Sequence, residues 1–173
     1  MDYIVVPDGI AADDCGRPLA KPSFVYRQVL DFVIGLCGST DTIYLAPANT
    51  CGDQKSEHEL GRAYLAQQSS ARVECPAVVF NEYIDTFGNA KHLGEYLNLQ
   101  LQGMEFDLIC AYIHSYRAEY CFKKAGFTIR KVHRVYYTVT DENILKRWWY
   151  YRHKKIHCLY ELAAFMRDYY RHR

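Results

Sequence analysis

The sequence predicts an α/β protein: a three-layer, Rossmann-like open sheet, mostly parallel, with helices on both faces. Two observations predict this fold class. Short apolar runs of strand length alternate with longer segments whose apolar residues recur at the helical period, as in repeated strand–helix–strand units. The chain also has 173 residues, 50% hydrophobic and 24% charged, which suits one compact domain with a buried core.

The first half of the chain supplies three strands and three helices. The strands are expected at residues 3–6, 42–46 and 75–80. Ser23 is the expected N-cap of a helix that reaches about residue 37. The tetrapeptide at 56–59, Ser-Glu-His-Glu, has the form of a capping box ahead of a helix to about residue 68. Asp85 or Thr86 then caps a third helix, and Gly103 lies just past its end.

The second half continues the alternation and closes with helices. The apolar run at 106–112 is the fourth strand, a helix follows from Ser115 to Lys124, and Gly126 ends it. Residues 128–139 are β-branched and partly alternating, which indicates a fifth strand. Two helices, at about 142–152 and 156–170, complete one domain over residues 1–173, with a basic aromatic helical terminus at 142–173.

Several function classes are excluded by the composition and by absent motifs. Seven cysteines at long intervals, without a CxxC pair, argue against a disulfide scaffold and a zinc ribbon. The N-terminus has no signal-peptide pattern, and no stretch has the length of a membrane span. The fingerprints GxSxG, GxxxxGK[ST], HExxH and GxGxxG are all missing. We therefore expect a cytoplasmic protein.

The charge is distributed unevenly along the chain. Residues 144–173 contain eight Lys/Arg and two Asp/Glu, although the net charge of the whole chain is only +1. This segment also holds both tryptophans. One interpretation is a non-enzymatic interaction module that binds RNA, an anionic surface or a protein, with Arg152, Lys154 and Lys155 in contact. The other is a closing helix pair whose aromatic residues pack on the sheet while its charges face water.

A candidate ligand site follows from the expected sheet. In open parallel sheets, ligands bind outside the carboxyl ends of the strands. The loops at this edge carry a set of polar residues and one glycine that form the candidate site: Asp8, Gly9, Ser56, Glu57, Glu82, Asp85, Thr86, Asn89, His114, Ser115 and Arg117.

Arg117 and His114 are the strongest members of this set. Arg117, on the first turn of a helix, would hold a carboxylate or phosphate with its rigid fork. The alternative is a surface arginine paired with Glu119 or Glu82. His114, at the exit of a strand, would act as a general acid or base, or would have a structural role.

Glu57, Glu82 and Asp8 each allow a functional and a structural interpretation. Glu57 and Glu82 would form a proton acceptor or a divalent-ion site, or would be charges favoured by helix dipoles. With His114 they are the catalytic candidates. Asp8 would bind a ribose hydroxyl or a metal, or belongs to an ordinary turn. One of Asp85 and Thr86 caps a helix, and Asn89 would contact the ligand.

The order of these motifs resembles the YdcF-like family of bacterial proteins, which includes SanA and ElyC. The matching segments are residues 56–57 with 63–65, residues 82–90, and residues 114–118 with Phe122, Lys123 and Gly126. The likeness extends from about residue 3 to residue 161. Two glycine-rich turns of the family are replaced here, by Pro-Asp-Gly at 7–9 and by Ala-Pro-Ala at 46–48.

The resemblance implies an anionic small ligand at the strand ends. This ligand would be of the nucleotide type, such as S-adenosylmethionine, or a phosphorylated sugar or lipid intermediate linked to the cell envelope. In an enzymatic form the protein would be a transferase or hydrolase. Arg117 would then hold the anion, His114 would move a proton, and a glutamate would act as base or hold a divalent metal ion.

Overall fold

A five-stranded parallel sheet runs through the part of the chain that the structure describes. The computed structural model describes residues 1–9, 13, 15, 17, 19–48, 56–77, 84–98, 103–139 and 146–173. The strands are β1 (Asp2–Val5), β2 (Thr42–Leu45), β3 (Arg72–Glu74), β4 (Glu105–Ala111) and β5 (Thr128–Val135). Their order in the sheet is β3-β2-β1-β4-β5, and every neighbouring pair is parallel.

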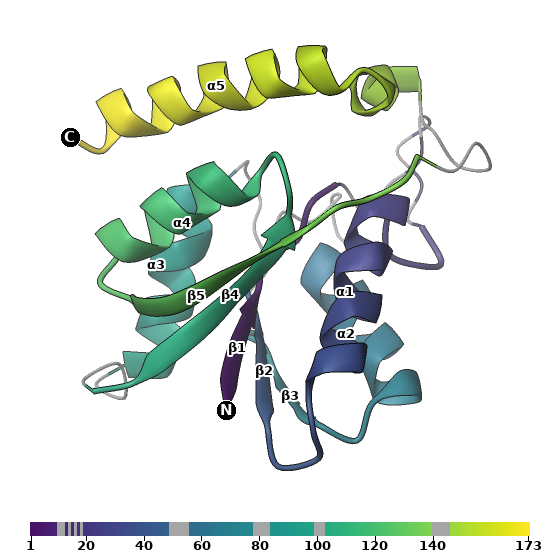
Figure 1. Cartoon of the computed structure of the whole chain (residues 1–173), viewed down its shortest axis with the longest axis vertical. Helices are drawn as coiled ribbons and strands as arrows, with labels where there is room; N and C mark the ends of the chain where they lie inside the picture. Colours follow the sequence, from purple (N-terminus) through teal and green to yellow (C-terminus); the bar gives the residue numbers. More distant parts are fainter. Residues whose placement is uncertain are drawn as a thin grey trace.

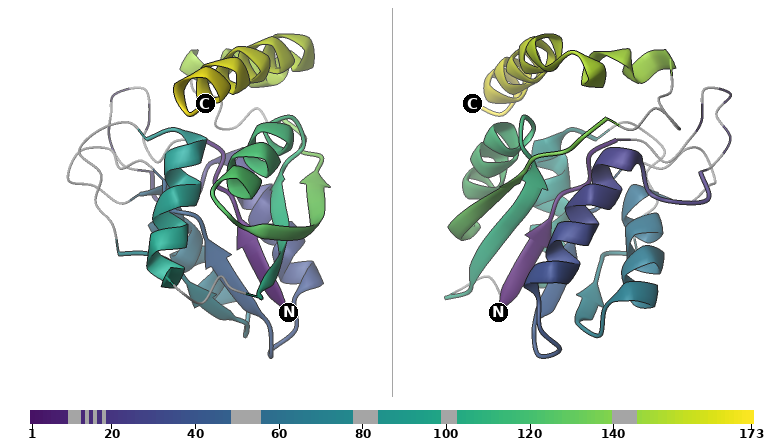
Figure 2. Two further views of the ribbon diagram at one scale, coloured as in Figure 1. Left: turned by 90° about the vertical axis from the view of Figure 1, so that its left-hand side faces the viewer. Right: turned by 45° about the vertical axis from the view of Figure 1, so that its right-hand side comes forward.

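Helices cover both faces of this sheet, as the sequence predicted. Helices α1 (Phe24–Leu36) and α2 (Glu57–Gln68) lie on one face, and α3 (Thr86–Leu97) and α4 (Ser115–Lys124) lie on the other (Figure 1). The 3₁₀-helix η3 (Lys146–Arg152) and helix α5 (Lys154–Arg171) cross the edge where β4 and β5 end (Figure 2). The predicted three-layer α/β architecture is therefore confirmed, and its closing helices occupy the edge where ligands usually bind.

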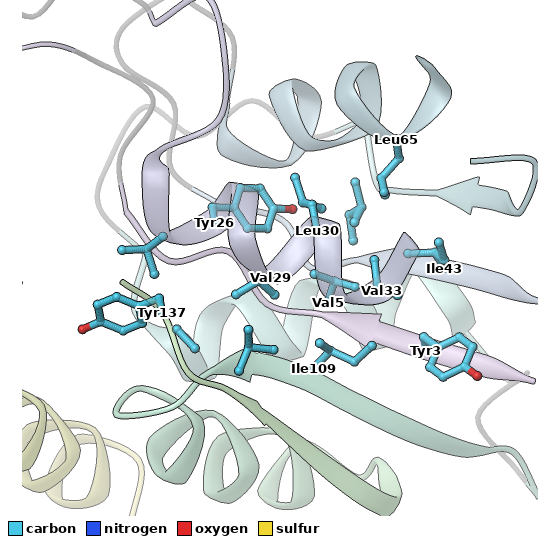
Figure 3. Packing of buried hydrophobic residues seen from close by; sticks show 14 of the residues in the cluster. Tyr3, Val5, Tyr26, Val29, Leu30, Val33, Ile43, Leu65, Ile109 and Tyr137 are labelled. Carbon is cyan, nitrogen blue, oxygen red and sulfur yellow. The ribbon is translucent and has the colours of Figure 1, made fainter. Parts of the chain in front are cut away.

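The two faces of the sheet bury two separate cores. Successive side chains of a strand point to opposite faces. Tyr3 and Val5 accordingly pack with α1 residues such as Val29 and Val33 (Figure 3). Ile4 and Val6 belong to the second core, between the sheet and helices α3 and α4. The near-continuous apolar strands β1 and β4 are thus explained by burial on both sides.

The predicted helix starts are confirmed by their caps. The hydroxyl of Ser23 accepts from the backbone N–H of Tyr26. Ser56 and Glu59 form the complete capping box at the start of α2. Asp85, rather than Thr86, is the N-cap of α3.

The expected third strand is misplaced. β3 occupies Arg72–Glu74, whereas residues 75–77 are not strand and 78–80 lie outside the described residues. Pro76 has no backbone N–H and suits the end of an edge strand. A three-residue edge strand also needs only a short apolar run, and here Val73 is its one aliphatic residue. The first of the two closing helices is a 3₁₀-helix rather than an α-helix.

Candidate functional site

Arg117 is the centre of a buried ion-pair network at the carboxyl edge of the sheet. It lies in the first turn of α4 and is only 7% exposed. Its Nε and Nη2 donate to the two carboxylate oxygens of Glu161, at 2.7 and 2.9 Å. Its Nη1 donates to Thr86 Oγ1 at 2.6 Å and to Asp168 Oδ2 at 3.3 Å. Both acids come from α5, so the closing helix covers the expected anion site with its own carboxylates.

Glu119, one of the two acids expected as an alternative partner of Arg117, is paired with other residues. Glu119 forms ion pairs with Lys123 at 2.7 Å and with Arg134 at 2.8 Å. Glu82 lies outside the described residues. The carboxylates that contact Arg117 are instead 44 and 51 residues further along the chain. Arg117 is therefore a buried arginine that joins α4 to α5, not a surface residue.

His114 also contacts Glu161. Its Nδ1 lies 3.1 Å from Glu161 Oε2 and 3.0 Å from Arg117 Nη2. Because Nη2 already donates to Glu161 Oε1, a proton on His114 Nδ1 would let both groups donate to the carboxylate at once. This assignment would also point Nε2 of His114 away from Glu161.

The charged neighbours decide the ionisation of Glu161. Burial alone would raise the pKa of this carboxyl, but His114 and Arg117 oppose it through charge and hydrogen bonds. The net result is a pKa well below the usual range. Glu161 is therefore a carboxylate at neutral pH, and the Arg117 fork already binds an anion in a water-poor site.

A second buried group surrounds Asp8, at the end of β1. The Tyr151 hydroxyl donates to Asp8 Oδ1, and burial followed by the charge of Asp8 raises the pKa of Tyr151. The ring of Tyr151 packs on His157, with centroids 4.3 Å apart. The Tyr137 hydroxyl and His157 Nδ1 are hydrogen-bonded at 2.6 Å, and His157 Nε2 is 4.0 Å from Glu161 Oε1. The Asp8 and Arg117 groups are thus neighbours beneath α5.

The remaining candidates at this edge serve mainly local structure. Ser115 donates to the carbonyl of Tyr112 at 2.6 Å. Asp85 caps α3 and also faces His172 at 2.9 Å. With its amide oriented to satisfy both contacts, Asn89 donates to the carbonyls of Asp85 and Pro47 at 3.3 and 3.1 Å. Gly9 has a φ of 121°, a conformation that favours glycine.

Ser56 and Glu57 belong to the start of α2, on the opposite face of the sheet from α4 (Figure 1). Both are buried, and Ser56 is engaged in its capping box. The neighbouring His58 accepts from the backbone N–H of Ala48 at 3.0 Å. Because Glu82 lies outside the described residues, the expected approach of Glu57 to Glu82 stays a prediction.

A cavity of about 340 Å³ opens beside Arg117, between α5 and the segment from the end of β4 to the start of α4. Its lining is mostly apolar and aromatic: Tyr112, Ile113, Tyr116, Cys158, Leu162 and Phe165, with Arg117 and Glu161 as the charged members. Cavities of this size are typical of small-molecule sites. The Arg117–Glu161 pair is therefore adjacent to space that an organic molecule would fill.

Sequence reasoning missed the contribution of α5. His157, Glu161, Ala164 and Asp168 form its buried stripe, at the spacing of one helix face. The expectation that the charges of the closing helices face water is confirmed for the Lys and Arg residues of α5 but is wrong for Glu161 and Asp168, which are buried. The expected packing of their aromatic residues is confirmed for Tyr151, whereas Trp149 and Tyr160 are exposed. The available signal was the spacing of His157, Glu161 and Asp168, at i, i+4 and i+11, which places all three on one side of the helix.

Comparison with known proteins gives no relative: no family model, no curated protein and no solved structure matches the chain. Within the described ranges, no group of three or more His, Cys, Asp or Glu residues is arranged to hold a metal ion. The helices in this part of the chain include none with the length and apolar character needed to cross a bilayer.

Proposed function

We propose that the protein binds an anionic small metabolite whose anion replaces Glu161 on Arg117. The observation that carries this proposal is the buried fork of Arg117, which holds a carboxylate through two hydrogen bonds of 2.7 and 2.9 Å. The same geometry suits a phosphate or the carboxylate of a ligand. Glu161 is then an internal substitute for the ligand, and binding requires α5 to release it.

The cavity supports a choice among the ligand classes. Its walls include the aromatic residues Tyr112, Tyr116 and Phe165 and the aliphatic residue Leu162. Such walls stack on a nucleobase or surround a lipid chain, whereas they offer few partners for the hydroxyl groups of a sugar. We therefore favour a nucleotide-type ligand or a phosphorylated lipid over a phosphorylated sugar.

A chemical step would depend on His114. The imidazole contacts Arg117 and would lie beside the anion that Arg117 holds. In a transferase or hydrolase it would donate or accept one proton at the reacting phosphate. Binding of the anion does not by itself require this step.

The test is thermal unfolding of the purified chain with AMP, S-adenosylmethionine, a short prenyl phosphate or glucose 6-phosphate. A ligand present at about 100 times its Kd adds about 2.7 kcal/mol of stability. For a chain of this size, that raises Tm by roughly 5–10 °C. We expect AMP or the prenyl phosphate to give such a shift, and glucose 6-phosphate to give a smaller one.

Two substitutions give opposite expectations and separate ligand binding from general stability. Glu161→Gln removes the competing carboxylate and should enlarge the shift, whereas Arg117→Lys removes the fork and should reduce it. Glu119→Gln is the matched control, because it removes a different carboxylate that is paired with an arginine. The proposal fails if no probe stabilises Glu161→Gln, or if Glu119→Gln enlarges the shift equally.

A further inference from the structure

The outward side of α5 is apolar, although its inward side is polar. Leu159, Leu162, Met166 and Tyr170 are 67, 57, 40 and 64% exposed. Their spacing of three or four residues places them along one side of the helix, which we call the outer stripe. The inward stripe is formed by His157, Glu161, Ala164 and Asp168. Burial within this domain therefore does not explain the apolar residues of the outer stripe.

The exposed charges beside the outer stripe are all positive. Residues 152–173 contain two acids, Glu161 and Asp168, and both are buried. All six Lys and Arg residues of the same segment are exposed: Arg152, Lys154, Lys155, Arg167, Arg171 and Arg173. Asp168 and Asp85 contact two of these cations, Arg167 and Arg171. The solvent-facing surface of α5 thus combines an apolar stripe with cations near both of its ends.

The first turn of α5 has a charge that opposes helix stability. Lys154 and Lys155 open the helix, its first turn has no acidic residue, and the side chain of its N-cap, His153, makes no capping hydrogen bond. Cations at a helix N-terminus are unfavourable because the helix dipole is positive there. Residues that weaken a helix locally are expected where they serve binding rather than folding, and Lys154 and Lys155 are such residues.

We propose that the outer stripe of α5 docks on an anionic lipid bilayer, at the level of the headgroups. A helix with an apolar side and flanking Lys and Arg residues lies in the membrane interface, where apolar side chains enter the acyl boundary and cations meet anionic headgroups. Tyr160 and Tyr169 of α5 and Trp149 of η3 are also exposed, and such side chains favour this interface. A single-stranded RNA would engage the cations and aromatic rings but would leave Leu159, Leu162 and Met166 in water.

The surface proposed for the bilayer continues toward the cavity. Leu162 belongs to the outer stripe and also lines the cavity beside Arg117, together with Tyr116, which is 54% exposed. Helix α5 lies across the end of the molecule in both views of Figure 2. Docking through the stripe would therefore turn the carboxyl edge of the sheet toward the membrane, with α5 still in its present position.

The experiment is co-sedimentation of the full chain with vesicles of phosphatidylcholine alone or mixed with phosphatidylglycerol. We expect binding to the mixed vesicles, much weaker binding to neutral ones, and weaker binding at high salt. Lys154→Gln/Lys155→Gln should reduce the partition coefficient about thirtyfold. Its matched control is Lys91→Gln/Lys131→Gln, two exposed lysines on α3 and β5, which should leave partitioning within about twofold of wild type.

A second pair of variants tests the apolar contribution. Leu159→Ser/Met166→Ser should reduce partitioning about tenfold or more, because both side chains would lose their burial in the acyl boundary. The control is Leu36→Ser, an exposed leucine on α1 that is 39% exposed. Circular dichroism should show that each variant keeps its helical content.

Four outcomes would overturn the proposal. Equal binding to neutral and anionic vesicles, or no binding to either, contradicts it directly. Salt-sensitive binding of poly(U) without vesicle binding would assign the cations to nucleic acid. A dimer that dissociates in Leu159→Ser/Met166→Ser, again without vesicle binding, would assign the stripe to a second copy of the chain.

Discussion

Replacing Arg117 by alanine should destabilise the fold far more than neutralising its main partner, Glu161. The structure gives the reason for this asymmetry. Arg117→Ala leaves the buried Glu161 with only His114 and the more distant His157 as contacts in the network, whereas Asp168 keeps its ion pair with Arg167. Glu161→Gln keeps the shape of the side chain, and Arg117 retains its bonds to Thr86 and Asp168.

The expected losses of unfolding free energy follow from what each substitution leaves buried. Removing one partner of a buried ion pair costs about 3–5 kcal/mol, because the other charge stays buried without compensation. Arg117→Ala should therefore lower the free energy of unfolding by about that amount, which is roughly 6–20 °C in Tm for a chain of this size. Glu161→Gln weakens hydrogen bonds to a charged group and should cost about 1–3 kcal/mol.

Urea unfolding at pH 7, followed by circular dichroism, measures both values with wild type in parallel. If Arg117→Ala does not fold, Glu161→Gln and Arg117→Lys still report the strength of the network. The reasoning is refuted if Arg117→Ala lies within 1 kcal/mol of wild type, or if Glu161→Gln is the more damaging change. Either result would mean that the charges are hydrated in solution and that α5 is not seated on Arg117.

Two further predictions concern buried groups elsewhere. Burial lowers the pKa of His157 and His58, so below their ordinary value of about 6.5 the unfolded chain binds more protons than the fold. Their contribution to the free energy of unfolding is therefore complete above that pH and falls as the pH drops. In urea titrations between about pH 7 and 5, His157→Asn should reduce this loss of stability, and a loss as steep as in wild type would contradict the assignment. Gly61→Ala would place a Cβ 2.6 Å from the hydroxyl of the buried Tyr26 and should lower the free energy of unfolding by about 1–3 kcal/mol. Gly35→Ala, whose Cβ would meet no neighbouring atom within 4 Å, should be neutral or stabilising. Equal Tm values for the two variants would argue against this packing.

Local signals carried most of the fold prediction. The caps at Ser23 and Ser56, and the glycine with positive φ at Gly126, depend on residues close in sequence, and the structure confirms all three. The third strand was misplaced because its pairing with β2, rather than its own apolar content, defines it. An edge strand of three residues leaves little pattern in the sequence.

The candidate site was predicted only in part, because its partners are distant in sequence. Asp8, Thr86, His114 and Arg117 were selected from their places after strands, and they do lie at one edge of the sheet or in the groups beneath α5. The pairing with Glu161 spans 44 residues and depends on how α5 docks. No periodicity rule indicates that the side of α5 with His157, Glu161 and Asp168 faces inward while its leucines face outward.

The most direct test of the central claim, that the Arg117–Glu161 pair seats α5 on the strand ends, is amide hydrogen exchange of Glu161→Gln. The comparison is with wild type and with Gly61→Ala, a variant that weakens packing between α1 and α2 without touching α5. The account predicts faster exchange confined to α5 and its neighbour η3 in Glu161→Gln, with β1 and β4 unchanged. Exchange in α5 that is unaltered, or that rises only in step with the whole fold as in Gly61→Ala, would contradict it.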